Sequence, residues 1–185
     1  IEEVGKKVKA RDCSGKRSVI STSNINIWIM FKQEIENWSS FIEYRQSQLV
    51  NSRVVFTNGC FDLLHPGHVD YLQKSKALGD FLLVGLNSDL SVRRLKGQDR
   101  PINAQEDRAY VLMGLSSVDQ VLVFEQDTPY ELIKAVEPDV LVKGGDWPVE
   151  HIVGRDIVWQ RGGQVLSIAL LSGYSTSKII ERIRG

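Results

Sequence analysis

The chain has 185 residues, with 42% apolar and 25% charged residues, which is ordinary for a soluble globular protein with one substantial core. Its 23 basic residues balance its 23 acidic ones, which argues against a broad surface for nucleic acid or membrane. An anionic ligand must therefore be held by a local cluster of charges, and we expect that ligand to be small.

The two cysteines, Cys13 and Cys60, are widely separated and lack metal-ligand spacing, which favours a reducing compartment. No apolar run approaches the roughly 18 residues needed to cross a bilayer. A basic N-terminal stretch precedes the apolar patch 25–31, but this patch is short, contains Asn26, and lacks the small-residue cleavage site of a secretory signal. We therefore expect a cytoplasmic protein.

Residues 1–30 mix charged and polar residues without a clear period, and we interpret them as an N-terminal extension of uncertain order. Residues 31–50 are expected to form an amphipathic helix, because apolar residues recur at helical spacings of three, four and seven: Phe31, Ile35, Trp38, Ile42 and Leu49. This stripe is expected to pack either against the rest of the chain or against another subunit, so a homo-oligomer is one of two alternatives.

The remaining residues, 51–185, alternate between short apolar runs and helical patterns. The runs predict five strands, at 53–57, 81–86, 120–124, 140–142 and 164–169. Helices are expected at 66–78, at 103–115, after 128 and after 175. Strands separated by helices predict right-handed crossovers, and so an α/β fold with a Rossmann-like, parallel, five-stranded sheet and helices on both faces.

Two of these helices carry more specific expectations. Asn103 is expected to cap the helix that follows it, with Glu106 completing a capping-box-like pair. The last helix is expected to bury Ile179, Ile180 and Ile183.

The segment after the first strand, TNGCFDLLHPGH at 57–68, carries the strongest chemical signal. Pro66 suits the first turn of a helix, and His65 and His68 then project from one side of that helix start. A helix N-terminus attracts anions, and two imidazoles there would add donors for phosphate oxygens. The alternative is that one histidine caps the helix while the other packs in the core.

This segment resembles the HxGH signature of the nucleotidyltransferase superfamily, which includes cytidylyltransferases and adenylyltransferases. Four further stretches strengthen the resemblance: RLKG at 94–97, RP at 100–101, VKGGDW at 142–147 and GYSTSK at 173–178. Together they resemble the adenylyltransferase domains of bacterial ADP-heptose synthesis, over roughly residues 50–184.

The resemblance implies an enzyme that transfers AMP from ATP to D-glycero-β-D-manno-heptose 1-phosphate, with ADP-heptose and pyrophosphate as products. ADP-heptose would serve lipopolysaccharide core or related glycan synthesis. Mg²⁺ is implied as the ion that accompanies ATP, and no dedicated protein metal site is expected. The chain resembles the stand-alone form of these domains, which implies a separate sugar kinase and phosphatase upstream.

The nucleophile of this reaction is a sugar phosphate that is already ionised, so catalysis calls for cations and N–H donors more than for a base. His65, His68 and Lys96 are expected to be catalytic. Asn87 and Asp89, after the second strand, are expected to bind the sugar phosphate. The nucleotide is expected to contact Thr57, Asn58, Gly59, Cys60, Phe61, Asp62, Gly67, Arg108, Lys143, Gly144, Gly145, Asp146, Ser175 and Thr176.

Several of these residues have simpler interpretations. Lys96 is expected in a loop after the second strand, where it could also be merely solvated. Arg108 begins an otherwise apolar stripe and needs an anionic partner, which is either a phosphate or a carboxylate in a buried ion pair. Capping alone explains Ser175, and a tight turn alone explains Gly144 and Gly145.

Two rival functions remain open at this point. The HxGH core is expected to contact phosphates and not bases, so a cytidylyltransferase acting on glycerol phosphate or another alcohol phosphate is an alternative. The second rival is a nucleotide-binding module without catalytic activity, which the presence of both signature histidines disfavours.

Overall fold

The computed structural model describes residues 7–11, 17–21, 37–145 and 147–185, and the chain divides into two compact units, Ile1–Glu36 and Asn37–Gly185. In the first unit, β1 (Lys7–Arg11) and β2 (Arg17–Ser21) pair antiparallel, with Lys7 opposite Ser21. The sequence analysis did not predict these strands. Phe31 and Ile35, which we placed on an amphipathic helix, lie outside the described residues.

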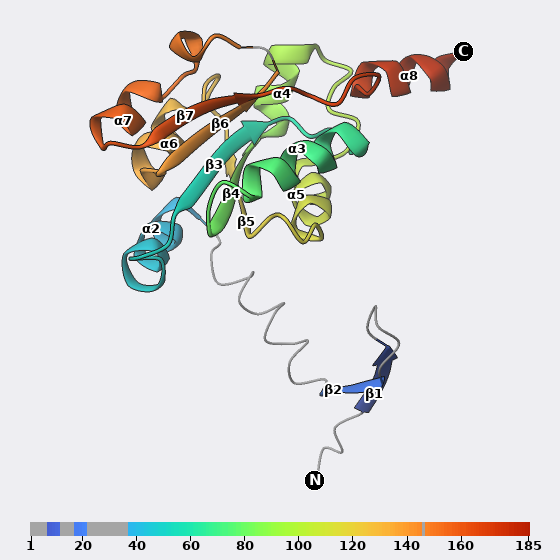
Figure 1. Ribbon diagram of the computed structural model, residues 1–185. Helices are drawn as coiled ribbons and strands as arrows, with labels where there is room; N and C mark the ends of the chain where they lie inside the picture. Colours follow the sequence, from blue (N-terminus) through green and yellow to red (C-terminus); the bar gives the residue numbers. More distant parts are fainter. Residues whose placement is uncertain (1–6, 12–16, 22–36, 146) are drawn as a thin grey trace. The chain divides into compact units, whose positions relative to one another are not determined.

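The second unit is built on a parallel sheet of the order β5-β4-β3-β6-β7 (Figure 1). Its strands are β3 (Val54–Gly59), β4 (Phe81–Asn87), β5 (Gln120–Phe124), β6 (Val140–Gly144) and β7 (Gln164–Ile168). All four strand pairings are parallel, so the predicted Rossmann-like sheet is confirmed. The strand order reverses between β3 and β6, because β4 and β5 continue on one side of β3 and the chain then returns to the other side.

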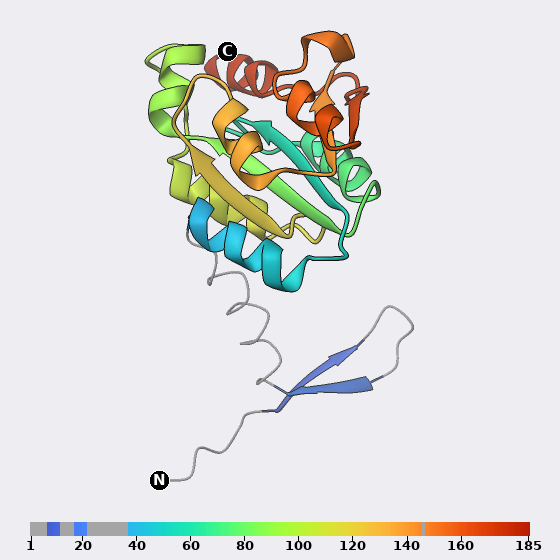
Figure 2. The same ribbon diagram turned by 90° about the vertical axis from the view of Figure 1, so that its left-hand side faces the viewer.

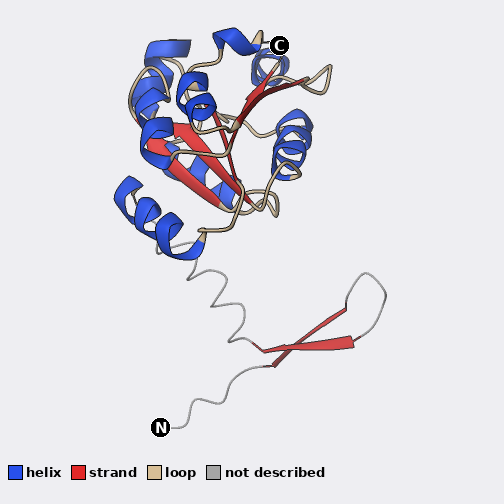
Figure 3. Ribbon diagram, turned by 60° about the vertical axis from the view of Figure 1, so that its left-hand side comes forward, coloured by secondary structure: helices blue, strands red, loops and turns tan. Residues whose placement is uncertain are grey.

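Helices cover both faces of this sheet, as predicted (Figures 2 and 3). One face carries α3 (Pro66–Lys76) and α5 (Gln105–Met113), and the other carries α2 (Trp38–Gln48), α6 (Tyr130–Val136) and α7 (Arg155–Gln160). Leu72 of α3 and Leu112 of α5 are fully buried in one apolar cluster with Val55, Leu82 and Val84 of the strands. Burial of this apolar surface is the main term that stabilises the sheet.

The helix α2 packs against its own domain. Phe41 is fully buried, with its ring centroid 6.0 Å from that of Phe81, and Trp38 donates its indole N–H to the carbonyl of Val123 at 3.0 Å. Phe41 is therefore the buried anchor of this helix, although the stripe in the sequence was centred on Trp38. These contacts bear out packing within the domain, and the homo-oligomer stays a prediction.

Three expectations about helices need correction. Lys96, which we expected in a loop, is the last residue of the helix α4 (Asp89–Lys96), and the side chain of Ser88 caps this helix. Ala104, not Asn103, is the N-cap of α5, because the Asn103 side chain donates to the carbonyl of Asp62 instead. The last helix, α8 (Thr176–Arg184), has no buried residue, and Ile183 is 76% exposed.

No helix of the described segments combines the length and the apolar character that a membrane crossing needs.

Candidate active site

A cavity of about 580 Å³ opens at the carboxyl ends of β3, β4 and β6. This is the crevice where strand order reverses, the usual ligand position in an open parallel sheet. Half of its lining comes from predicted site residues: Asn58, Gly59, Cys60, Phe61, Asp62, His68, Asn87, Lys96, Lys143 and Thr176. We call it the β3–β6 cavity. The topology thus brings together residues that are up to 118 positions apart in the sequence, from Asn58 to Thr176.

The two signature histidines have different roles. His65 is the N-cap of α3, and its Nδ1 accepts a hydrogen bond from the backbone N–H of His68 at 3.3 Å. Since neutral imidazole carries one proton, a lone pair used at Nδ1 places the proton on Nε2. The rings of His65 and His68 stack with centroids 3.8 Å apart, and only His68 lines the β3–β6 cavity.

The His68 ring is held in an apolar corner. Burial, together with the neighbouring His65, lowers the pKa of His68 to about 4, so the ring is neutral near pH 7. Phe61 contacts it edge-on at 5.2 Å between centroids, and Phe61 adopts a left-handed backbone with φ of 43°. A strained backbone beside a functional side chain indicates that the fold enforces this placement. Among the described residues, His68 Nδ1 has no hydrogen-bond partner.

Gly67 allows this pair of imidazoles to form. A Cβ on Gly67 would lie 3.1 Å from Nδ1 of His65 and 3.3 Å from Cβ of Tyr174. Gly67 is buried and does not line the cavity. Close packing against His65 and Tyr174 therefore accounts for this glycine, and its contact with the nucleotide stays a prediction.

Positive charge gathers around the cavity. Lys143 lies at the end of β6 and donates to the side-chain oxygen of Asn58 at 3.3 Å, and burial lowers the pKa of Lys143. Lys96, the last residue of α4, also lines the cavity and lowers the pKa of Lys143 further by like-charge repulsion. Cations that face each other across a cavity are suited to a polyanion, which relieves their repulsion.

Arg100 also lines the cavity. It belongs to a motif quoted from the sequence, but it was not predicted as a site residue. Its Nε pairs with Asp62 at 2.5 Å, and the other carboxylate oxygen accepts from the backbone N–H of Ile102 at 2.7 Å. The Asp62 side chain is 1% exposed. Asp62 therefore holds the segment before α5 in place and aims Arg100 at the cavity. The Arg100-Pro101 pair in the sequence was the available signal.

The expectation that Arg108 binds phosphate is corrected. Its side chain is fully buried, and it donates to the carbonyls of Cys60 at 2.6 Å and Asn87 at 2.9 Å and to the carboxylate of Asp89 at 2.8 Å. The buried ion pair that the sequence left open is thus the observed arrangement. Arg108 thus links the ends of β3 and β4. Neither Arg108 nor Asp89, its partner in the ion pair, lines the cavity.

Other predicted residues also lie outside the cavity lining. Thr57 is buried, with its hydroxyl 2.6 Å from that of Tyr71. A Cβ on Gly144 would lie 2.9 Å from Leu170, so close packing explains this glycine, and Gly145 needs its positive φ of 107°. Asp146 lies outside the described residues.

The start of α8 closes one side of the cavity. Ser175 is the N-cap and accepts from the backbone N–H of Lys178 at 3.2 Å, so capping accounts for it. Thr176 and Ser177 line the cavity, and the Thr176 hydroxyl donates to the carbonyl of Leu63 at 3.3 Å. This bond ties the last helix to the segment that carries the histidines.

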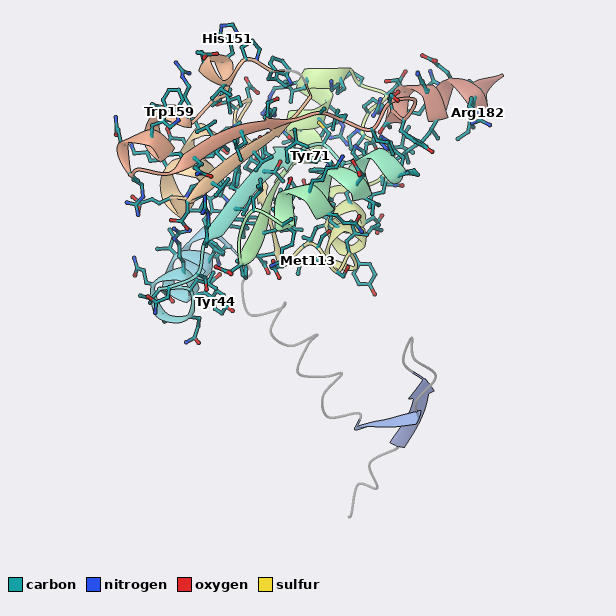
Figure 4. The ribbon with its side chains drawn as sticks, viewed as in Figure 1. Tyr44, Tyr71, Met113, His151, Trp159 and Arg182 are labelled. Carbon is teal, nitrogen blue, oxygen red and sulfur yellow. The ribbon has the colours of Figure 1, made fainter. Side chains whose placement is uncertain are left out.

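The sequence analysis missed the far wall of the cavity, which comes from the segments after α4, β5 and β6. Figure 4 shows His151 on the 3-10 helix η1 (Val149–His151), at the top of the domain. The missed residues are Leu95, Arg100, Asp127, Thr128, Pro129, Trp147, His151, Ile152, Val153 and Ser177. Half of these residues are apolar, among them the indole of Trp147, and such side chains are suited to a base or a sugar ring. Leu95, Arg100, Trp147 and Ser177 stood within quoted motifs, but none of the four was named as a site residue.

Cys60 is a cavity residue without nucleophilic character, because burial raises the pKa of its thiol. Within the described segments, no group of three or more His, Cys, Asp or Glu side chains could hold a metal ion. The cavity lining carries three cations, Lys96, Arg100 and Lys143.

Known proteins resemble this chain over the domain that carries the cavity. The cytidylyltransferase-like family matches residues 56–182. The bifunctional protein HldE of Wolinella succinogenes is 62% identical over 133 residues, which are 72% of this chain and 27% of that protein. The bifunctional protein HldE of Aliarcobacter butzleri is 46% identical over 167 residues, which are 90% of this chain and 33% of that protein.

The chain thus spans between a quarter and a third of the length of these curated relatives. Among solved structures, a lipopolysaccharide core biosynthesis protein from Thermoplasma volcanium is 29% identical, with a TM-score of 0.55, and the match covers 68% of this chain and 100% of that one.

Proposed function

This chain belongs to the cytidylyltransferase-like family and is a nucleotidyltransferase, and from this premise we propose that it transfers AMP from ATP to D-glycero-β-D-manno-heptose 1-phosphate. The products are ADP-heptose and pyrophosphate. The observation that carries the proposal is the β3–β6 cavity, in which His68 faces the same space as Lys96 and Lys143. The choice of a heptose phosphate is supported by the similarity to HldE proteins and to a lipopolysaccharide core biosynthesis protein.

The proposed reaction is an in-line displacement at the α-phosphorus of ATP. The sugar phosphate oxygen forms the new P–O bond, the bond to the β-phosphate oxygen breaks, and pyrophosphate leaves with the electron pair. No proton has to be removed from the nucleophile, so the protein's task is to position the phosphates and to neutralise their charge. His68, Lys96, Lys143 and Arg100 supply donors and cations for this purpose.

Mg²⁺ enters the proposal as the ion that arrives with ATP, where it shields and orients the phosphates. The carboxylate of Asp62 already accepts from Arg100 and from the N–H groups of Ile102 and Asn103. The cavity residues therefore fit a metal carried by the triphosphate and leave little for a protein-bound one.

We also propose a compartment for the enzyme and the reactions before and after its own. It acts in the cytoplasm, where ATP is supplied, and a sugar kinase and a phosphatase provide its heptose 1-phosphate. The product feeds lipopolysaccharide core or related glycan synthesis.

The test is incubation of the chain with Mg²⁺, ATP or CTP, and one of three acceptors: either anomer of the heptose 1-phosphate, or glycerol 3-phosphate. We expect ADP-heptose by mass spectrometry and matching pyrophosphate release with ATP and the β anomer. CDP-glycerol formed with CTP in preference would replace the proposal by a cytidylyltransferase. A lack of pyrophosphate release with every pair would refute it.

A further inference from the structure

A second cleft lies at the opposite, amino end of the sheet. It has a volume of about 550 Å³ and is lined by α2, the segment before β3, α6 and the end of α7. In Figure 4, Tyr44 marks α2 at the bottom of the domain, while His151 marks the β3–β6 cavity at the top. We call this second cleft the α2–α6 cleft. Its volume is within the usual range of small-molecule pockets, roughly 300–1,000 Å³.

Five charged side chains line the α2–α6 cleft. Three are cations, Arg45, Lys134 and Arg161, and two are carboxylates, Glu137 and Asp139. Positive charge is therefore in excess by one. Arg161 pairs with Glu137 at 2.9 Å, where both side chains are about half exposed.

Arg45 is held loosely by its carboxylate. Its Nη2 lies 3.3 Å and 3.4 Å from the two oxygens of Asp139, longer than about 2.9 Å for a strong charge-assisted bond. Asp139 is engaged more closely by the backbone N–H of Val54, at 2.7 Å. Within the part of the chain that the structure describes, the buried Nη1 of Arg45 has no hydrogen-bond partner.

We propose that the α2–α6 cleft is a second binding site, which takes the phosphate or carboxylate group of a small metabolite between Arg45, Lys134 and Arg161. An oxyanion there offsets the excess positive charge of the three cations that line the cleft. Burial and the nearby Arg161 both lower the pKa of Arg45, so these guanidinium groups repel each other across the cleft. The site is separate from the β3–β6 cavity and does not depend on the proposed reaction.

The test is an NMR titration of the ¹⁵N-labelled full chain with inorganic phosphate, and in a second arm with acetate. Phosphate is also expected to bind at the β3–β6 cavity, so both arms are repeated in a His68→Ala variant. We expect saturable shifts of the Arg45 side chain and of the amides of Ser52 and Gly162, with millimolar affinity. These shifts persist in His68→Ala, and the two arms show whether the cleft prefers phosphate or carboxylate.

Lys134 and Arg161 are exposed, so their replacement leaves the fold intact. A Lys134→Gln/Arg161→Gln variant is expected to weaken binding at the cleft at least fivefold, while Arg184→Gln, a matched change on α8, leaves it unchanged. Absence of saturable shifts in both arms, or shifts that Lys134→Gln/Arg161→Gln does not alter, would overturn the proposal. Pyrophosphate release by the same samples reports on the proposed function separately.

Discussion

The two ends of the sheet differ in how far their cationic side chains are paired with carboxylates. At the amino end, Arg161 pairs with Glu137 and Arg45 with Asp139, so most of the charge is balanced by carboxylates of the protein. At the carboxyl end, the neighbouring carboxylate Asp62 is buried against Arg100, and the amines of Lys96 and Lys143 face the same cavity. Each cleft is lined by three cationic and two acidic side chains, so net charge alone does not distinguish the two ends. What prepares a site for a polyanion is which cations the fold leaves unneutralised.

The largest effect is expected at His68, on the carboxyl end. His68→Ala should retain the fold but lose about 10²–10³-fold in kcat, the usual cost of one donor to a developing charge. The measurement is steady-state pyrophosphate release, with circular dichroism and thermal unfolding as the check on folding. A variant that turns over at the wild-type rate would remove His68 from the mechanism.

The next effect compares a buried carboxylate, Asp62, with a partly exposed one, Asp139. Asp62→Asn should lower the free energy of unfolding by about 3 kcal/mol, because Arg100 is left enclosed without its counter-charge. Asp139→Asn, at the amino end, should cost about 1 kcal/mol, because the Asp139 side chain is 41% exposed and solvent screens the loss. Urea unfolding of both variants gives the comparison. Equal losses would show that the two ends do not differ in this way.

Lys143→Gln tests the unneutralised charge directly. Loss of this partly buried ammonium should reduce kcat/KM by about 10–100-fold, since a charged donor to phosphate is worth roughly 1.5–3 kcal/mol. The matched control is Lys74→Gln, which removes a lysine paired on the surface with Asp70 and should leave kcat/KM unchanged. Similar losses in both variants would point to general charge and against a specific role of Lys143.

The smallest effect is a pH dependence confined to the carboxyl end. The pKa of His68 is lowered to about 4 in the folded chain, from 6.5, so the unfolded chain takes up a proton first as pH falls. Neutral His68 therefore contributes to the free energy of unfolding above pH 6.5, and this contribution is lost as the pH falls toward 4. Its size is on the order of 1–2 kcal/mol after allowance for partial exposure.

This dependence is measured by urea unfolding at a series of pH values between 7 and 4. His68→Gln, which cannot titrate, should show a visibly smaller decline. Equal acid sensitivity in the two proteins would contradict the lowered pKa. Lys134 of the α2–α6 cleft does not titrate in this range, so Lys134→Gln should follow the wild-type profile.

Prediction from sequence succeeded where a local pattern was decisive. The strand Gln120–Phe124 was placed at its observed limits, because the apolar run 121–124 stands between the polar residues Gln120 and Glu125. The helix α4 was missed, because Arg93, Arg94 and Lys96 read as a solvated loop. Its one fully buried apolar residue is Val92, which leaves too weak a stripe to reveal the helix.

The sequence by itself determined the α/β fold and the dense motif around His65 and His68, since periodicity and a contiguous signature are local properties. Only the tertiary structure decided which residues share the β3–β6 cavity. In the folded chain Arg108 is buried between β3 and β4, and Asp62 holds Arg100 at the cavity. Trp147 and His151 lie in the far wall. The physical reason is that the partner of a buried charge is chosen by strand order and helix packing, which join residues far apart in the chain.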